Sequence, residues 1–506
     1  MVRCVVLAAM GSSMVFATVA RAQEPAGEVD NGFGNFGQFG PTGLPTGRTP
    51  LLSYGADVGL GETDNVFLTS RDKVSQTIAT TDVDFVVNQP GRLLDVRALG
   101  AFTDLAYLEG AYGNEFIGRF DGQVKYALVP ERLIWVLRDD FGQATLDAFT
   151  PTTPNNLEDV NYVSTGPDLD LRLGGTGFLK ATARYANAYY QTSPFDSNRL
   201  LATLAAGLQL SARSTVSLNG AAERILFKNT TVNNDFDRYS AFARYEVQGA
   251  RTTFALDLGG TRVEQKGDAT GVTTVTEPGA PTVTEPSAPI AVIAATGPPH
   301  DTTTTEPLGR LELGRALSPS MRVNFAAGRE LTDASSSFTT QQAGAIGTIN
   351  YAPTPLTSDV YTSTYASGGW QYVRYRTMID ITGRWERDRY PGASEFDLNS
   401  DSVQVRVQRR LTSAFSAELI GSWYKTDYPN IALDPLLGSP ESDTKMIGAV
   451  VAWRQGRWLQ VSLRYDHSSY SVTQGAAGYG ENRIFLLVGY RPRTAVLPEP
   501  GAAEQP

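Results

Sequence analysis

The stretch LSYGADVGLG, residues 52–61, alternates apolar residues with small or charged ones along its whole length. In an extended chain the apolar residues fall on one face, and Asp57 falls on the other with the serine and the glycines. A helix would need apolar residues at i, i+3, i+4 and i+7, and this stretch does not have that spacing. It therefore predicts a β-strand with one apolar face and one face of small and polar groups.

The same period of two recurs along most of the chain, for example at 116–126, 179–185 and 403–408. Short turns rich in Gly, Pro and Ser alternate with longer polar connections, as in outer-membrane barrels. Nine turns joining ten hairpins predict an all-β fold, a transmembrane antiparallel up-and-down β-barrel of about twenty strands, with about eighteen as the fallback. The turns are placed at 89–92, 129–132, 174–177, 211–214, 248–251, 317–320, 372–375, 412–414 and 454–457.

The ends of the chain suggest export. Residues 1–22 have a cationic start, an apolar centre and the small-residue site Ala20-Arg21-Ala22, which predicts a cleaved signal peptide. We expect residues 23–50 to be a flexible periplasmic segment, residues 51–490 to form the barrel, and residues 491–506 to be a flexible tail. Within the barrel, residues 264–306 form a low-complexity loop insertion in which TVTEP occurs twice. An inert insertion and a glycosylated or ligand-binding loop are both open interpretations.

Composition excludes several classes of function. The formal net charge is -10, which argues against a nucleic-acid partner. The only cysteine is Cys4, inside the predicted signal peptide, so the mature chain has no disulfide, thiol nucleophile or cysteine metal site. After the signal peptide, no apolar run reaches the roughly 18 residues of a membrane-spanning helix.

Enzymatic and metal-binding interpretations find little support. There are two histidines, and His300 lies in the low-complexity loop. Asp466, His467 and Ser468 are adjacent on a predicted strand, so their side chains alternate between faces and cannot form a triad among themselves. The carboxylates of Asp168 and Asp170 lack the spacing of a calcium loop. We expect no catalytic residue, no metal and no cofactor.

The tryptophans and the last strand point to the outer membrane of a Gram-negative bacterium, with both termini periplasmic. Tryptophans next to the turns and near the loop ends suggest two interfacial belts, although core tryptophans of a soluble sandwich remain the alternative. Ile484, Leu486, Val488 and Tyr490 form one apolar row that ends in an aromatic residue, with Phe485 on the other face. This row resembles the C-terminal assembly signal of outer-membrane proteins. The expected partners are therefore outer-membrane lipid, lipopolysaccharide and the barrel-assembly machinery.

Candidate selectivity residues lie on the lumen face. Asp168 and Asp170 are on the sixth predicted strand, Arg384 is on the fifteenth and Arg406 on the sixteenth. In a ring of about twenty strands these groups would face each other, which would create a transverse field that attracts anionic sugar groups to the arginine wall. The alternative is that each charge pairs with a neighbour.

Three short motifs resemble a known family, the outer-membrane β-barrel porins associated with exopolysaccharide and PEP-CTERM protein-sorting loci. They are ETDNVFL at 62–68, the acid-rich strand with Asp82 and Asp84, and LVPER at 128–132 before a Leu/Trp strand. The resemblance implies an outer-membrane barrel with a part in polysaccharide export, and it brings no catalytic residues.

These observations lead us to expect a channel for passive passage or export of extracellular polysaccharide or related solutes. A TonB-dependent receptor would need a large plug domain, for which the roughly 28 residues between the signal peptide and the first strand leave no room. The alternative is a structural or adhesive surface barrel with a closed lumen and partner-binding loops.

Overall fold

The computed structural model describes residues 51–146, 152–231, 233–266, 302–342, 357–430, 441–456, 458–472 and 478–492. Within these residues the chain forms twenty β-strands, one α-helix and two short 3-10 helices. The predicted signal peptide, the segment 23–50 and the tail from residue 493 lie outside the described residues. The strands are β1 (Leu52–Thr63), β2 (Gln76–Gln89), β3 (Leu94–Tyr107), β4 (Glu115–Val129), β5 (Leu133–Thr145), β6 (Leu157–Leu173), β7 (Gly177–Tyr190), β8 (Ser197–Ser211), β9 (Ser214–Phe227) and β10 (Phe236–Gln248). They continue with β11 (Thr252–Gln265), β12 (Thr302–Ser318), β13 (Met321–Asp333), β14 (Val360–Arg374), β15 (Thr377–Arg389), β16 (Leu398–Arg410), β17 (Phe415–Asp427), β18 (Glu441–Gln455), β19 (Leu459–Val472) and β20 (Tyr479–Tyr490).

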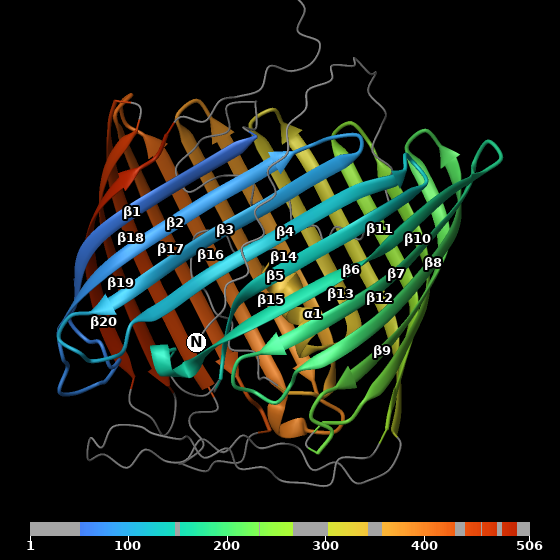
Figure 1. Cartoon of the computed structure of the whole chain (residues 1–506), viewed down its shortest axis with the longest axis horizontal. Coiled ribbons are helices and arrows are strands. Elements are labelled where there is room, and N and C mark those ends of the chain that lie inside the picture. The colour runs from blue at the N-terminus through green and yellow to red at the C-terminus, as the bar shows by residue number, and fades with distance from the viewer. Residues whose placement is uncertain are drawn as a thin grey trace, which may run out of the picture.

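The strands close into one antiparallel up-and-down barrel (Figure 1). Each strand pairs with the next along the chain, and β1 pairs with β20 to close the ring. The predicted fold class and the strand count of about twenty are confirmed. All nine predicted turns join the strands expected of them. The turn predicted at 372–375 lies slightly later, at Tyr375-Arg376 between β14 and β15. We call this rim the turn end and the opposite rim the loop end.

The outer surface of the barrel is apolar. Along β1 the exposed large side chains are Leu52, Tyr54, Val58 and Leu60, while Asp57 faces the lumen and is buried. The same alternation holds on β20, where Ile484, Leu486, Val488 and Tyr490 are exposed. A solvated soluble protein would hide these rows, because contiguous apolar surface of this extent is unfavourable in water.

Two predicted boundaries were wrong. Residues 264–265 and 302–306 belong to strands and not to the loop insertion, because Val263 to Gln265 pair in register with Thr302 to Thr304. The threonines are β-branched, and such residues favour extended backbone once a partner strand supplies hydrogen bonds. Arg491 was assigned to a flexible tail, but its backbone N–H donates to the Trp458 carbonyl at 2.6 Å and its side chain is held by two aspartates described below.

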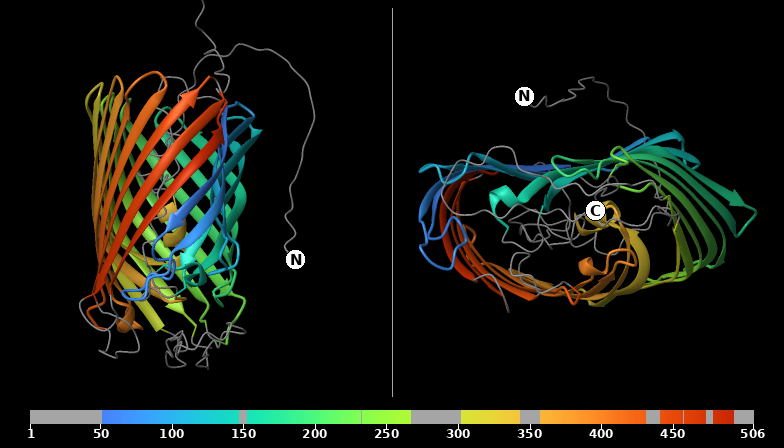
Figure 2. Two further views of the ribbon diagram at one scale, coloured as in Figure 1. Left: turned by 90° about the vertical axis from the view of Figure 1, so that its left-hand side faces the viewer. Right: turned by 90° about the horizontal axis from the view of Figure 1, so that it is seen from below.

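The barrel is oval in cross-section, and α1 (Ala334–Gln342) lies inside it (Figure 2). The helix follows β13 directly. None of the helices in the described ranges combines the length and apolar character needed to cross a membrane. The 3-10 helices η1 (Pro154–Asn156) and η2 (Ser394–Phe396) lie in loop-end connections.

Candidate functional site

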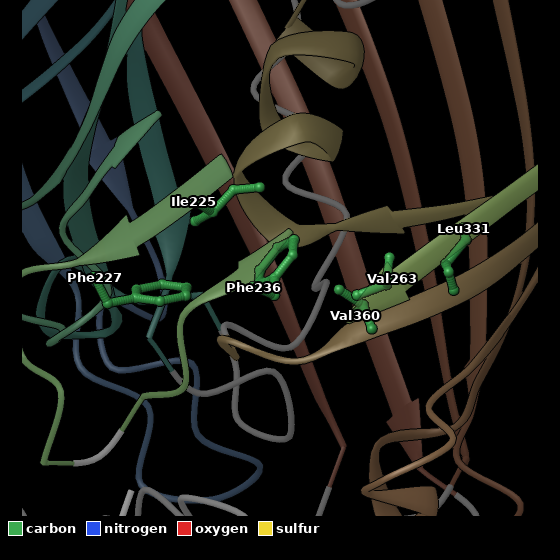
Figure 3. Packing of buried hydrophobic residues seen from close by; sticks show 6 residues of the cluster. All are labelled: Ile225, Phe227, Phe236, Val263, Leu331 and Val360. Atoms are coloured by element: carbon green, nitrogen blue, oxygen red, sulfur yellow. The ribbon is translucent and has the colours of Figure 1, made fainter. Parts of the chain in front are cut away.

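The loop-end parts of β13 and β14 leave the barrel wall and turn into the lumen. On β14 residues of both strand faces are buried over 360–363, and on β13 the buried Leu331 and Asp333 continue the row of the exposed Phe325. In a strand of the barrel wall, only the side chains that face the lumen would be buried. The buried cluster in Figure 3 joins this inward hairpin to the wall strands β9, β10 and β11 and consists of Ile225, Phe227, Phe236, Val263, Leu331 and Val360.

Asp333 starts the helix that continues this hairpin. Its carboxylate accepts a hydrogen bond from the Ser336 backbone N–H at 3.2 Å and another from the Ser336 hydroxyl at 2.7 Å. The first N–H groups of a helix have no partner within the helix, and an aspartate at the N-cap satisfies one of them. Asp333 therefore ends the strand and begins the helix.

The same carboxylate anchors the helix to the wall through buried charges. Arg199 on β8 donates to Asp333 at 2.9 Å and lies 3.5 Å from Glu223 on β9. Arg238 on β10 pairs with Glu223 and lies 3.9 Å from Asp333. Arg199 is 1% exposed, Asp333 4% and Glu223 8%. Removing one member of such a buried set leaves an uncompensated charge, so the network holds α1 in one place.

The residues after Asp333 tie α1 to further strands. Ser335 and the hydroxyl of Tyr190 on β7 are 2.8 Å apart, and Ser337 hydrogen bonds to the hydroxyl of Tyr361 on β14. Phe338 packs against a buried cluster that includes Val160 on β6 and Phe195. Helix α1 thus reaches from β13 to strands on the far side of the oval, and we call Asp333 to Phe338 the lumen brace.

Sequence reasoning missed the lumen brace, because the helix is too short to produce a clear helical period. A signal existed in DASSS at 333–337, where an N-cap residue follows the last alternating residues of a strand. Apart from the Ser337–Tyr361 hydrogen bond, the contacts that keep the helix inside the barrel involve residues about 100 positions away or more, and no local pattern marks them.

The four predicted selectivity residues face the lumen, but each lies beside an opposite charge. Asp168 is 2.5 Å from Arg184, and Asp170 is 3.7 Å from Lys180, both on the neighbouring strand β7. Arg384 pairs with Glu386 at 2.6 Å, and Arg406 pairs with Glu418 at 2.9 Å. The charges are therefore neutralised locally, which favours the pairing alternative over a field across the lumen.

The predicted assembly residues lie on opposite faces of β20. Tyr490 ends the outward row at the turn end, 6.4 Å from the Tyr54 ring and 6.5 Å from the Trp458 ring. Phe485 points into the lumen, where its ring covers Gly61 so closely that a Cβ at that position would clash. Phe485 thus belongs to the closure of the barrel and not to the outward aromatic row.

The 62–68 motif closes the barrel at the loop end. β1 and β20 pair only from Ala56–Tyr490 to Thr63–Arg483, a shorter register than the other strand pairs have. Thr63 donates to the Glu481 carboxylate at 2.7 Å, and Asn482 donates to Asp64 from its backbone at 2.7 Å and from its amide at 2.6 Å. Although partial burial opposes ionisation, these bonds hold the pKa of the Asp64 carboxyl below its usual value.

Arg491 closes the same seam at the turn end. Its guanidinium pairs with Asp57 on β1 and lies 2.7 Å from Asp84 on β2. Asp84 was part of the acid-rich strand in the family resemblance, and this contact gives it a structural role. Side chains at both ends thus supplement the short backbone register between β1 and β20.

The remaining residues considered for chemistry stay apart. His467 points away from Asp466, which pairs with Arg464 at 2.6 Å, and its ring Nδ1 lies 2.9 Å from the amide oxygen of Asn482. Across the described ranges, no three His, Cys, Asp or Glu side chains are placed to hold a metal ion together.

No family model matches the chain, and no curated protein matches it. Among solved structures it is similar to the copper transporter OprC, with 11% identity, a TM-score of 0.40 and coverage of 87% of this chain and 81% of that one. It is also similar to the FrpB iron transporter from Neisseria meningitidis (F5-1 variant), with 8% identity, a TM-score of 0.39 and coverage of 87% and 82%. A third is the siderophore receptor PirA from Pseudomonas aeruginosa, with 9% identity, a TM-score of 0.38 and coverage of 87% and 80%.

Proposed function

We propose that this protein is an outer-membrane channel for passive passage or export of polar solutes, with the lumen brace as its constriction. The outward apolar rows support membrane insertion, and exposed aromatic residues lie near both rims of the barrel. Those near the turn end include Tyr54, Trp135, Phe415, Trp453, Trp458 and Tyr490. Those toward the loop end include Phe116, Tyr185, Tyr239, Trp385 and Tyr465.

The observation that carries the channel proposal is the lumen brace inside a polar lumen. Paired charges line the inner wall on strands far apart in the ring, including β6, β7, β15 and β16. A barrel of this strand number leaves room for water or a plug, and polar inward groups are typical of a wetted lumen. Because α1 crosses the oval, solutes would pass beside it.

Extracellular polysaccharide is the cargo that we propose, on the basis of the family resemblance of the 62–68 and 128–132 motifs. An unbranched sugar chain is polar and narrow, and it could thread a lumen that the brace has reduced. No described side chain makes the polymer the sole candidate, so related hydrophilic solutes belong to the same proposal.

A structural or adhesive barrel with a closed lumen is the second candidate, and the same brace favours it. If α1 and its anchors fill the lumen, the barrel would conduct no ions and the loops would carry the function. Channel and adhesin therefore differ in one measurable property, the conductance of the folded protein.

The deciding experiment is conductance of the purified barrel in a planar lipid bilayer. We expect stepwise current from the natural chain, and larger steps with frequent transitions from Asp333→Ala, because the helix loses its anchor. Asp237→Ala is the matched control, since Asp237 pairs with the half-exposed Arg224 on the other strand face and does not contact α1. Silence from both the natural chain and Asp333→Ala, with folding shown by heat-modifiable migration, would support the closed barrel.

A further inference from the structure

Positive charge is concentrated at the turn end. The eight turns between β2 and β17 each have an exposed arginine within the turn or at most two residues away. These windows contain ten arginines and no lysine, against Asp95 and Glu131 as the acids. The whole chain has a net charge of -10, so the clustering runs against the overall composition.

The ten arginines of these windows have no carboxylate partner in the described structure, unlike Arg491 at the seam. Among the residues that the structure describes, none of the ten forms an ion pair, whereas several exposed cations at the loop end do. Arg224 pairs with Asp237 at 2.7 Å and Arg262 with Glu264 at 2.7 Å. An exposed guanidinium without a carboxylate partner keeps donors for an external anion, even where one of them bonds to a backbone carbonyl, as Arg376 does with Leu411 at 3.3 Å.

The strand register divides these arginines between two faces. Arg172 on β6, Arg322 on β13 and Arg410 on β16 belong to the inward rows, since their neighbours Leu173, Phe325 and Leu411 are in the exposed apolar rows. Arg374 and Arg409 belong to the outward rows of β14 and β16, and so does Arg315 on β12, an exposed arginine that lies just before the window of the β12–β13 turn and is not one of the ten. Because β6 and β16 are ten strands apart in the ring, the inward set stands on opposite sides of the mouth.

We propose that the turn-end mouth is a collecting site for a polyanionic chain, one that bears carboxylate, phosphate or sulfate groups along its length. This inference rests on the channel proposal and names the chemical class of its solute. A ring of like charges raises the local concentration of an oppositely charged chain by about 10-fold or more. This enrichment decreases as the salt concentration rises, because salt screens the charges. Past the mouth, the paired lumen charges would hold a polyanion only weakly, which allows it to move on.

Phospholipid phosphates are the competing occupant, and the two arginine faces separate the two cases. The outward set lies where lipid head groups would be, and the inward set surrounds the mouth of the lumen. Removing three arginines from each face in turn gives two variants with the same charge change. The inward variant is Arg172→Gln, Arg322→Gln and Arg410→Gln, and the outward control is Arg315→Gln, Arg374→Gln and Arg409→Gln.

The test measures block of channel current by dextran sulfate, with neutral dextran of the same chain length as reference. The side of the bilayer that the turn end faces is assigned with Gly175→Cys, in the β6–β7 turn, and a membrane-impermeant charged thiol reagent. For the natural chain we expect dextran sulfate to block from the turn end at a concentration about tenfold lower than from the loop end. The inward variant should lose most of this difference, and the outward control should keep it.

Each alternative result has one meaning. Equal block from both sides, or loss of block in the outward control alone, would overturn the collecting site and leave the channel intact. A binding measurement on the barrel in lipid nanodiscs at low salt provides a test that needs no current. If dextran sulfate binds the natural chain and the inward variant with the same affinity, the collecting site is overturned. Absence of current together with binding that the inward variant loses would support the site and reject the channel.

Discussion

Asp64 links the closure of the barrel to pH at the scale of a single residue. Its pKa is lowered in the folded protein, so the ionised form stabilises the seam. This stabilisation is fully present above the ordinary aspartate value of about 4 and is lost as the pH falls through the lower folded value. The ionised carboxylate is therefore the stronger acceptor for the two bonds that Asn482 donates.

We predict that Asp64→Ala weakens the barrel at neutral pH and makes its stability less sensitive to acid. Loss of two hydrogen bonds to a charged group costs about 1.5 to 3 kcal/mol each at most, reduced here by exposure to solvent. The unfolding midpoint in denaturant, measured in detergent between pH 7 and pH 3, checks this. Glu62→Ala is the control, and the same acid dependence in Asp64→Ala as in the natural chain would contradict the prediction.

At the element scale, the end of β20 combines two features, the outward apolar row that ends at Tyr490 and the ion pairs of Arg491 across the β1–β20 seam. Tyr490 ends the outward row, and Arg491 directly after it bonds to Asp57 and Asp84 across the seam. Because the two residues are adjacent, a truncation of the tail has different effects depending on which side of Arg491 it falls.

We predict that truncation after Pro492 is tolerated, whereas truncation after Tyr490 lowers the amount of folded barrel in the outer membrane. Tyr490→Asp should lower it as well, because a charge on the outward surface is costly in lipid. Tyr490→Phe is the matched control and should keep near-natural levels. Quantitative immunoblots of outer-membrane fractions measure all four, and equal levels in all of them would refute the role of both residues.

The lumen charges on β15 and β16 are element-scale features too. Arg384→Glu would place a carboxylate beside Glu386, and Arg406→Glu would place one beside Glu418. We predict that each substitution lowers the free energy of unfolding by about 1 to 3 kcal/mol, which lies between the values for exposed and for buried ion pairs. Arg409→Glu, on the exposed outward row, is the control. Unfolding midpoints decide, and unchanged stability of the double variant would revive the idea of unpaired lumen charges.

At the scale of the whole molecule, the two rims differ in connection length and in charge. Long connections such as the one between β11 and β12 are on one rim, and short arginine-rich turns are on the other. Short turns are periplasmic in outer-membrane barrels, which would place the arginines in the periplasm.

We predict that an epitope inserted near Gly279 is accessible to antibody on intact cells, while one inserted between Gln455 and Gly456 is accessible only after permeabilisation. Both sites lie in connections, so insertion should leave the strands intact. Reversed accessibility would place the arginine rim at the cell surface and would invert the direction in which the proposed polyanion travels.

Much of the architecture follows from local pattern. The alternation in residues 52–61 and its repeats predict the strands, and the nine turns predict their number, because a strand in lipid must show its apolar row outward and a tight turn needs Gly, Pro or Ser chemistry. The outward row of Ile484 to Tyr490 could be assigned for the same reason. These properties depend on residues close together in the chain.

Other features were decided only when distant strands met. The role of Asp64 depends on Asn482 at the other end of the chain, and the role of Arg491 depends on Asp57 and Asp84. The lumen brace exists because Asp333 meets Arg199 and Arg238 in the interior. Local sequence determined a barrel of about twenty strands, since period and turn chemistry are short-range. The lumen brace and the β1–β20 seam were decided by tertiary structure, because their ion pairs and hydrogen bonds join residues that lie far apart in the chain.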